Sequence, residues 1–158
     1  MSEVSTRRFT HEEICAILPQ QPPFMFLDES TMTGNEMVST YLIRGDESFL
    51  AGHFKNDPVF PAAIVFEALG QAGCLWVLVN AEERLGAPVA ANQVLFASMD
   101  GAHFYRKMKP GQRLVMKLKL AQLRSPLAIF RGSVWTEDNQ RVAELEKLVL
   151  AFGVEAPE

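Results

Sequence analysis

The stretch GHFKNDPVFPAAIVFEALGQAG, residues 52–73, decides the fold of this chain. It passes from a polar loop that holds His53, through two prolines, into an almost wholly apolar run. Proline suits the first turn of a helix, and the spacing of the apolar residues predicts a helix over residues 61–83. A helix that is apolar nearly all round is a buried one. Because Glu67 and Gln71 interrupt the apolar run, we expect a core helix and not a membrane span.

After this helix the apolar residues alternate with polar ones, which is typical of strands. The segments KPGQ, LRSP and EDNQ predict the turns between them. We expect strands at about 93–108, 112–124, 127–136 and 141–152. Long consecutive strands favour an antiparallel meander. The predicted fold class is α+β, a single domain over residues 1–158 in which a curved antiparallel sheet wraps one long central helix.

The chain before this helix also predicts regular structure. Thr10 and Glu13 stand at the spacing of a capping box, so a short first helix is expected there. The proline-rich segment that follows predicts extended backbone, and TGN predicts a turn into a strand over residues 35–45. We expect residues 1–9 and 154–158 to be flexible termini.

The composition indicates a globular protein, with 48% hydrophobic and 22% charged residues among 158. The net charge of −4 argues against a nucleic-acid partner, which usually requires a basic domain. Cys15 and Cys74 lie in apolar surroundings without a CxxC spacing, so both are expected to be reduced, buried thiols. The first residues contain no apolar leader. We expect a cytoplasmic protein with no membrane partner.

A sheet wrapped on one helix leaves exposed strand edges. Pairing one edge with a second copy of the chain is the simplest way to cover it. We therefore expect a homodimer or a higher even-numbered oligomer.

One carboxylate, Glu67, lies inside the predicted core helix. A buried ionised carboxylate is costly unless it is paired or hydrogen-bonded, and burial raises its pKa. Gln71 stands four residues further on, where its amide can hydrogen-bond and orient the acid. The pattern favours a catalytic pairing of Glu67 with His53. Two alternatives remain open: His53 is an ordinary surface histidine, or Glu67 faces solvent.

The other histidines carry less information. His11 lies at the predicted cap of the first helix and His103 within a predicted strand, so both are expected to be exposed or packed residues. The histidines and acidic residues show no ligand spacing such as HxxxH or HExxH, so no metal site is expected.

Three blocks of the sequence resemble one enzyme family. ILPQQPPFMFLD, GHFKNDPVFPAAIVFEALGQ and VLFASMDGAHFYRKMKPGQRL resemble, in order and separation, the motifs of the FabZ-type 3-hydroxyacyl-[acyl-carrier-protein] dehydratases. The resemblance extends from about Ile17 to Phe152. It implies the hot-dog fold, a catalytic histidine at His53, a catalytic glutamate at Glu67 and a supporting glutamine at Gln71. In that family the histidine of one subunit faces the glutamate of the other, in an acyl tunnel at the dimer interface.

The resemblance implies loss of water from a 3-hydroxyacyl thioester, giving a trans-2-enoyl thioester. His53 would take a proton from C2, and Glu67 would protonate the departing hydroxyl at C3. The backbone N–H groups of Ala62 and Ala63, at the helix start, would stabilise the enolate-like thioester oxygen. No metal or redox cofactor is implied, because the substrate arrives on the phosphopantetheine arm of acyl carrier protein.

An acyl chain and an acidic carrier protein both need a binding surface. The residues that we expect to line the tunnel, although core packing explains them equally well, are Phe60, Ile64, Phe96 and Met99. The residues that we expect to receive the carrier, unless they are only an ordinary solvated strand end, are Arg106, Lys107 and Lys109.

Four positions depart from the family pattern, namely Lys55, Ala62, Phe60 and Gln20. Ala62 matters most, because it replaces a glycine whose backbone angles an alanine would resist. The dehydratase–isomerase relatives carry aspartate where this chain has Glu67, so we expect dehydration without isomerisation. The departures indicate a diverged member, in fatty acid biosynthesis or in a specialised acyl or polyene pathway.

Two other functions compete with this one. A hot-dog thioesterase would use Glu67 to activate water, and release of free thiol would decide that case. A non-catalytic acyl-binding or carrier-docking subunit would follow if Ala62 closes the oxyanion site. The presence of His53 and of the GHF loop argues against the thioesterase, and retention of both His53 and Glu67 argues against complete loss of activity.

Overall fold

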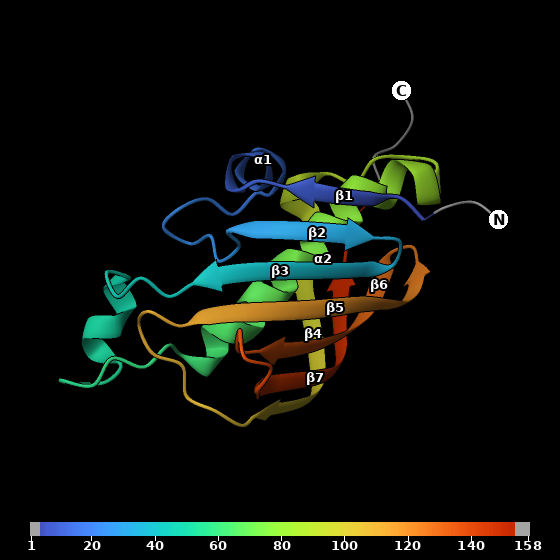
Figure 1. Cartoon of the computed structure of the whole chain (residues 1–158). Helices are drawn as coiled ribbons and strands as arrows, with labels where there is room; N and C mark the ends of the chain where they lie inside the picture. The colour runs from blue at the N-terminus through green and yellow to red at the C-terminus, as the bar shows by residue number, and fades with distance from the viewer. Residues whose placement is uncertain (1–3, 154–158) are drawn as a thin grey trace.

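The central helix forms where the sequence predicts it. The computed structural model describes residues 4–153, and in it helix α2 spans Ala62–Leu85. Pro61 is the N-cap, and Gly86, at φ 81°, ends the helix in the left-handed conformation that favours glycine. By composition α2 is long and apolar enough to cross a membrane, but 67% of its most apolar stretch is buried inside the domain. It is therefore the core helix (Figure 1).

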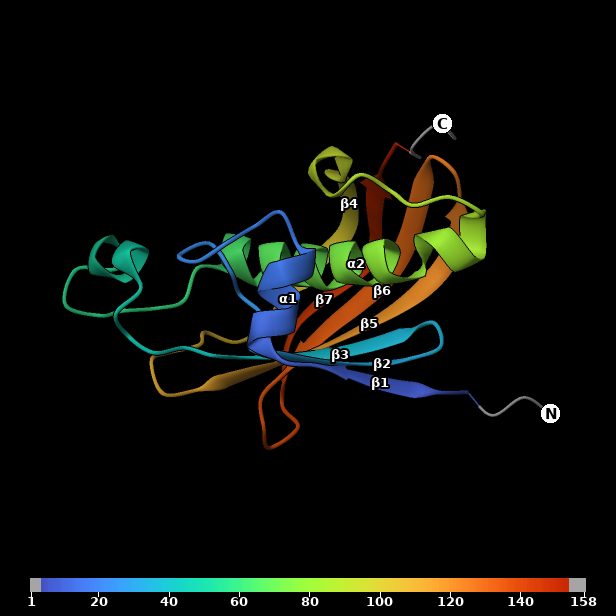
Figure 2. The ribbon, with the colours of Figure 1, turned by 90° about the horizontal axis from the view of Figure 1, so that it is seen from above.

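The strands of the described residues form one antiparallel sheet in the order β1-β2-β3-β5-β6-β7-β4. They are β1 (Thr6–Phe9), β2 (Glu29–Thr33), β3 (Glu36–Leu42), β4 (Leu95–Phe104), β5 (Arg113–Arg124), β6 (Leu127–Trp135) and β7 (Arg141–Ala151). Figure 2 shows α2 lying along one face of the curved sheet, with the short helix α1 (His11–Ile17) near it. This arrangement confirms the predicted α+β hot-dog fold.

The predicted meander is right for three strands and wrong for the fourth. β5, β6 and β7 pair consecutively. β4 does not pair with β5; it pairs with β7 at the edge of the sheet, and β3 lies beside β5 instead. The reason is the connection over residues 105–112, which is too long for a hairpin turn and carries the chain from the edge to the middle of the sheet.

The expectation of a flexible N-terminus is wrong for residues 6–9. They form β1, which pairs with β2, and Phe9 at its end is only 1% exposed. A buried aromatic side chain and a ladder of backbone hydrogen bonds together fix this segment. The capping box predicted for α1 is present. Residues 1–3 and 154–158, also predicted to be flexible, lie outside the described part of the chain.

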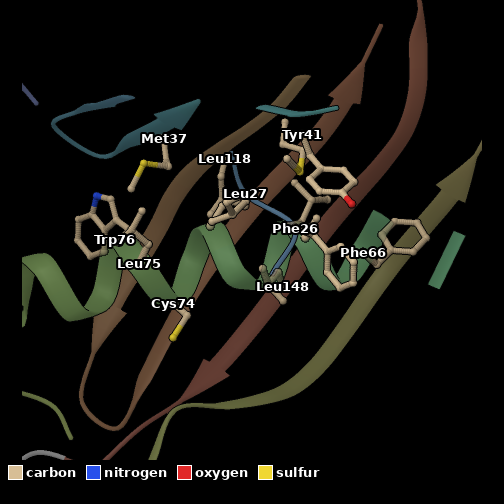
Figure 3. Close-up of a cluster of buried hydrophobic side chains, with 14 of the residues drawn as sticks. Phe26, Leu27, Met37, Tyr41, Phe66, Cys74, Leu75, Trp76, Leu118 and Leu148 are labelled. Carbon is tan, nitrogen blue, oxygen red and sulfur yellow. The ribbon is translucent and has the colours of Figure 1, made fainter. Parts of the chain in front are cut away.

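The hydrophobic core lies between α2 and the sheet. The Trp76 indole N–H donates to Gly34 O at 2.9 Å, in the turn between β2 and β3. Figure 3 shows Leu118 on one side of α2 and Cys74 on the other. Both cysteines are free thiols, as predicted, and Cys74 is buried. The predicted burial is wrong for Cys15, which is partly exposed because Ile14 is the only buried residue of α1.

Candidate active site

Glu67 lies in the second turn of α2, between Phe66 and Ala68, which are both buried. The glutamate itself is partly buried. Burial raises the pKa of its carboxyl group above the usual value, although a hydrogen bond from Gln71 opposes the rise. The carboxyl group therefore keeps its proton to a higher pH than an exposed glutamate does, which suits a proton donor.

Gln71 is completely buried one turn further along α2. Its Nε2 donates to Glu67 Oε1 at 3.2 Å and to Phe24 O at 3.1 Å. Its Oε1 accepts a hydrogen bond from Phe26 N at 2.9 Å. The amide thus uses both its donor hydrogens and its acceptor, and it holds the carboxyl group in a fixed position relative to the segment before β2.

His53 directly follows the short helix η1 (Ser48–Gly52), and its side chain is partly exposed. Its Nδ1 lies 2.7 Å from Val59 O. A carbonyl oxygen only accepts, so Nδ1 carries the proton and Nε2 of the neutral ring has a free lone pair, as a base requires. Val59 N donates back to His53 O at 2.7 Å, and the imidazole stacks on Phe54 with ring centroids 4.0 Å apart. The imidazole is therefore held in one tautomer and one orientation.

The structure does not join the two predicted catalytic side chains within one chain. The hydrogen bonds of His53 stay inside its own loop, and those of Glu67 go to α2. Figures 1 and 2 show η1 and the loop after it projecting beyond the start of α2. The histidine is thus carried on an outlying loop, whereas the acid lies inside the domain.

The start of α2 presents backbone donors. Pro61 provides no side-chain cap. The N–H groups of Ala62 and Ala63 have no hydrogen-bond partner within residues 4–153. Ala62 does not have a positive φ, so an alanine fits this position without backbone strain. The departure from the family glycine therefore leaves the helix start intact and its two N–H groups available.

The four residues predicted to line an acyl tunnel fall into two groups. Phe60 is fully buried and packs against three other aromatic rings, so it belongs to the core. Ile64 and Phe96 are partly buried at the edge of the core. Met99, on β4, is 44% exposed. Ile64, Phe96 and Met99 are thus the three of the four that are at least partly exposed.

The predicted carrier-binding residues lie in the connection between β4 and β5, beside the loop that carries the histidine. Lys109 Nζ forms an ion pair with Asp57 Oδ1 of that loop at 3.1 Å. Arg106 and Lys107 are exposed. Because Asp57 already compensates part of the Lys109 charge, Arg106 and Lys107 are the stronger candidates for an acidic partner.

The remaining histidines do not join this site. His11 Nδ1 donates to a backbone carbonyl beside α1, and His103 is exposed on β4. Within residues 4–153, no group of three or more His, Cys, Asp or Glu side chains could hold a metal ion. The backbone groups that fix His53 and Gln71 could not be predicted, because no side-chain pattern in the sequence indicates them.

A hot-dog domain with an oriented, partly buried carboxyl group and a loop imidazole defines a class of protein, which comparison with known families identifies. The model of the FabA-like domain matches residues 18–146. The 3-hydroxyacyl-[acyl-carrier-protein] dehydratase FabZ of Syntrophobacter fumaroxidans is 31% identical over 137 residues, which cover 86% of this chain and 89% of that protein. FabZ of Geobacillus thermodenitrificans is 32% identical over 144 residues, with 90% and 94% covered. The chain therefore belongs to the FabA-like family, among the FabZ-type dehydratases.

Solved structures agree on the fold. The dehydratase heterocomplex ApeI:P of Xenorhabdus doucetiae superposes with a TM-score of 0.73 at 16% identity, covering 90% of this chain and 91% of that one. A thioesterase of Haemophilus influenzae superposes with a TM-score of 0.65 at 15% identity, covering 92% of both chains. At these identities the two structures show the hot-dog fold alone.

Proposed function

We propose that this protein is a 3-hydroxyacyl-[acyl-carrier-protein] dehydratase, which converts a 3-hydroxyacyl thioester to the trans-2-enoyl thioester. The main observation in favour is Glu67, whose carboxyl group has its pKa raised by burial and is oriented by Gln71. The FabZ relatives bear the name of this activity. A neutral acid and a neutral imidazole are the pair that elimination of water needs.

The base in this proposal is His53 Nε2, which removes a proton from C2 of the substrate. The bond from Nδ1–H to Val59 O stabilises the imidazolium that forms. The electron pair of the C2–H bond becomes the C2=C3 double bond while the C3–O bond breaks. Glu67 gives its proton to the departing hydroxyl, which leaves as water. The reverse hydration uses the same two groups with their protonation states exchanged.

The thioester carbonyl gains negative charge as the C2 proton departs. The unpaired N–H groups of Ala62 and Ala63, at the positive end of the α2 dipole, can stabilise this charge. Proton transfer and backbone hydrogen bonding are sufficient for the reaction, so the proposal involves no metal or redox cofactor. The phosphopantetheine arm belongs to the substrate.

The complete site in this proposal is built from two chains. The loop of His53 projects beyond α2 (Figures 1 and 2), and β4 is an edge strand with Leu95 64% exposed. Antiparallel pairing of β4 with its copy would cover that edge and bring the histidine loop of each chain towards Glu67 of the other. Arg106 and Lys107 would receive the carrier protein at the entrance. Two free thiols agree with the reducing environment of the cytoplasm, where we propose that the enzyme acts.

An assay of dehydration and reverse hydration tests the function directly. The substrates are 3-hydroxyacyl and trans-2-enoyl thioesters on acyl carrier protein. We expect conversion by the parent, and a loss on the order of a hundredfold to ten-thousandfold in His53→Ala and in Glu67→Gln. Glu83→Gln is the matched control, because this glutamate is exposed on α2, and it should keep the parent rate. Release of free thiol would indicate a thioesterase, and no conversion of any chain length by the folded parent would indicate a binding subunit.

A further inference from the structure

A phenylalanine ring lies directly against the backbone of α2, one turn beyond the proposed catalytic acid. A Cβ atom built on Gly70 would lie 2.6 Å from Phe96 Cδ2 and 2.7 Å from Phe96 Cε2. Side chains do not approach one another so closely. Only a glycine at this position therefore allows the Phe96 ring to rest on the helix.

The ring covers the helix face that begins at Glu67. Residues three, four and seven positions apart share one face of a helix, so Glu67, Gly70 and Cys74 lie in one stripe. Burial, and then the charge of Glu67, raises the pKa of Cys74 to about 12, in agreement with a thiol on the same side as the acid. Figure 3 shows Cys74 on the side of α2 away from Leu118, where the yellow ribbon of β4 passes.

Strand β4 directs both Phe96 and Met99 towards this face. Phe96 pairs with Leu150 and Met99 with Leu148, and both leucines are buried in the core. Directly opposite residues of an antiparallel pair point to the same side of the sheet. The two side chains differ in packing: Met99 is 44% exposed, whereas the Phe96 ring packs against Gly70. A β-bulge lies directly after Phe96, between Phe96 and Ser98, so the pairing of β4 with β7 shifts between Phe96 and Met99.

We propose that Phe96 limits the length of the acyl chain, so that the substrates are short-chain 3-hydroxyacyl thioesters. This inference rests on the proposed function, because it takes Glu67 as the position of the C3 hydroxyl. An acyl chain that runs from Glu67 along the stripe meets the Phe96 ring after three residues of helical rise, about 4.5 Å. That length holds only a few carbons. A longer chain must displace the ring from Gly70 and lose the contacts between them.

The test compares the parent with Phe96→Ala on 3-hydroxybutyryl and 3-hydroxydecanoyl carrier thioesters. We expect the parent to prefer the short substrate. In Phe96→Ala, the ratio of kcat/KM for the long substrate to kcat/KM for the short one should rise about tenfold or more. Phe96→Leu, which keeps more of the apolar volume and is the safer variant for folding, should shift the ratio in the same direction by less. The matched control is Leu127→Ala, an exposed leucine on β6, which should keep the parent ratio.

Binding separates this inference from the proposed function. Non-reactive amide analogues of the short and long acyl-pantetheines are titrated into parent and Phe96→Ala by calorimetry. A gain in affinity for the long analogue alone in the variant supports the inference even if no chain is dehydrated. Dehydration with the same length preference in the parent and in both Phe96 variants overturns it and leaves the proposed function intact. A parent that prefers the long substrate overturns it as well.

Discussion

Gln71 lies four residues after Glu67 on α2, and its Nε2 donates to Glu67 Oε1 at 3.2 Å. The same amide accepts from Phe26 N and donates to Phe24 O. One buried side chain therefore connects the proposed acid to the segment before β2. The orientation of the acid and the packing of that segment depend on the same residue.

Replacing Gln71 with alanine should damage both stability and catalysis. Phe26 N and Phe24 O would lose their partner, and the loss at the buried Phe26 N–H alone should cost about 1–3 kcal/mol. Without the hydrogen bond from Gln71, the Glu67 carboxyl group is no longer held in place. We expect kcat to fall on the order of a hundredfold, because catalysis depends on the position of this group. Urea unfolding and a kcat measurement check the two effects. Gln122→Ala, at an exposed position on β5, is the control, and equal losses in the two variants would contradict the role given to Gln71.

Glu67→Gln should be more stable than the parent at neutral pH although it is inactive. Burial raises the folded-state pKa of Glu67 above 4.5, so the folded state binds this proton more tightly than the unfolded state. Stability from this group is present below the unfolded pKa and is lost as pH rises through the folded pKa. Glutamine does not titrate and avoids that loss. Calorimetric Tm values at neutral pH and below pH 4.5 should show a gain that disappears in acid; a gain of equal size at both would argue against titration of Glu67.

Two inactive variants should restore activity when mixed if the site is built from two chains. Random exchange between His53→Ala and Glu67→Gln makes half of the dimers mixed, and each mixed dimer has one of its two sites intact. We expect about a quarter of the parent activity after co-refolding. Light scattering on each partner alone should show dimers, and a clean monomer near 17.6 kDa would contradict the assembly. Activity that stays at background in confirmed mixed dimers would place both groups of each site in one chain.

Charge reversal at Arg106 and Lys107 should weaken carrier binding without affecting the chemistry. We expect KM for carrier-bound substrate to rise about tenfold at low salt with kcat unchanged, because rim charges act mainly on encounter and are screened by salt. Substrates on free pantetheine should show no difference. Lys147→Glu, at an exposed lysine on β7, is the matched control. A rise of the same size with free pantetheine substrates would assign these residues to the acyl site and not to the carrier.

The N-terminal strand should be needed for folding. Phe9→Ala removes a buried ring and should lower the free energy of unfolding by about 3–5 kcal/mol. Val4→Ala, at an exposed position before β1, should have no measurable effect. Thermal unfolding of both variants checks the prediction. If both variants have the Tm of the parent, residues 6–9 contribute nothing to stability and behave as the flexible terminus that the sequence indicated.

The sequence predicts those parts of the molecule that depend on the pattern of neighbouring residues along the chain. The helix over 61–83, the capping box of α1 and the three consecutive strands β5 to β7 follow from apolar spacing and turn residues. The position of β4 does not follow, because strand periodicity is the same whichever neighbour the strand pairs with. β1 was missed because four residues carry too little pattern; its pairing with β2 and the burial of Phe9 reveal it.

The candidate site divides in the same way. Spacing on one helix predicts that Gln71 reaches Glu67, and the hydrogen bond is present. The tautomer of His53 depends on the carbonyl of Val59, and every residue has such a carbonyl, so nothing in the sequence marks it. From the sequence, Phe60 fits a tunnel wall and the core equally well. Its contacts with three aromatic rings show that it belongs to the core.

The edge position of β4 has a consequence for how the protein folds. Leu95 pairs with Ala151, across most of the C-terminal half of the chain, and β3 pairs with β5 across the whole of α2. Such contacts require large loops to close before they contribute stability, so folding should be slow compared with that of a helical bundle of equal size. β4 must wait for β7, which is the last strand to be synthesised. A newly made chain therefore completes the edge at β4 only at the end of its own folding. In the proposed dimer, a site shared by two chains should form after each subunit has folded.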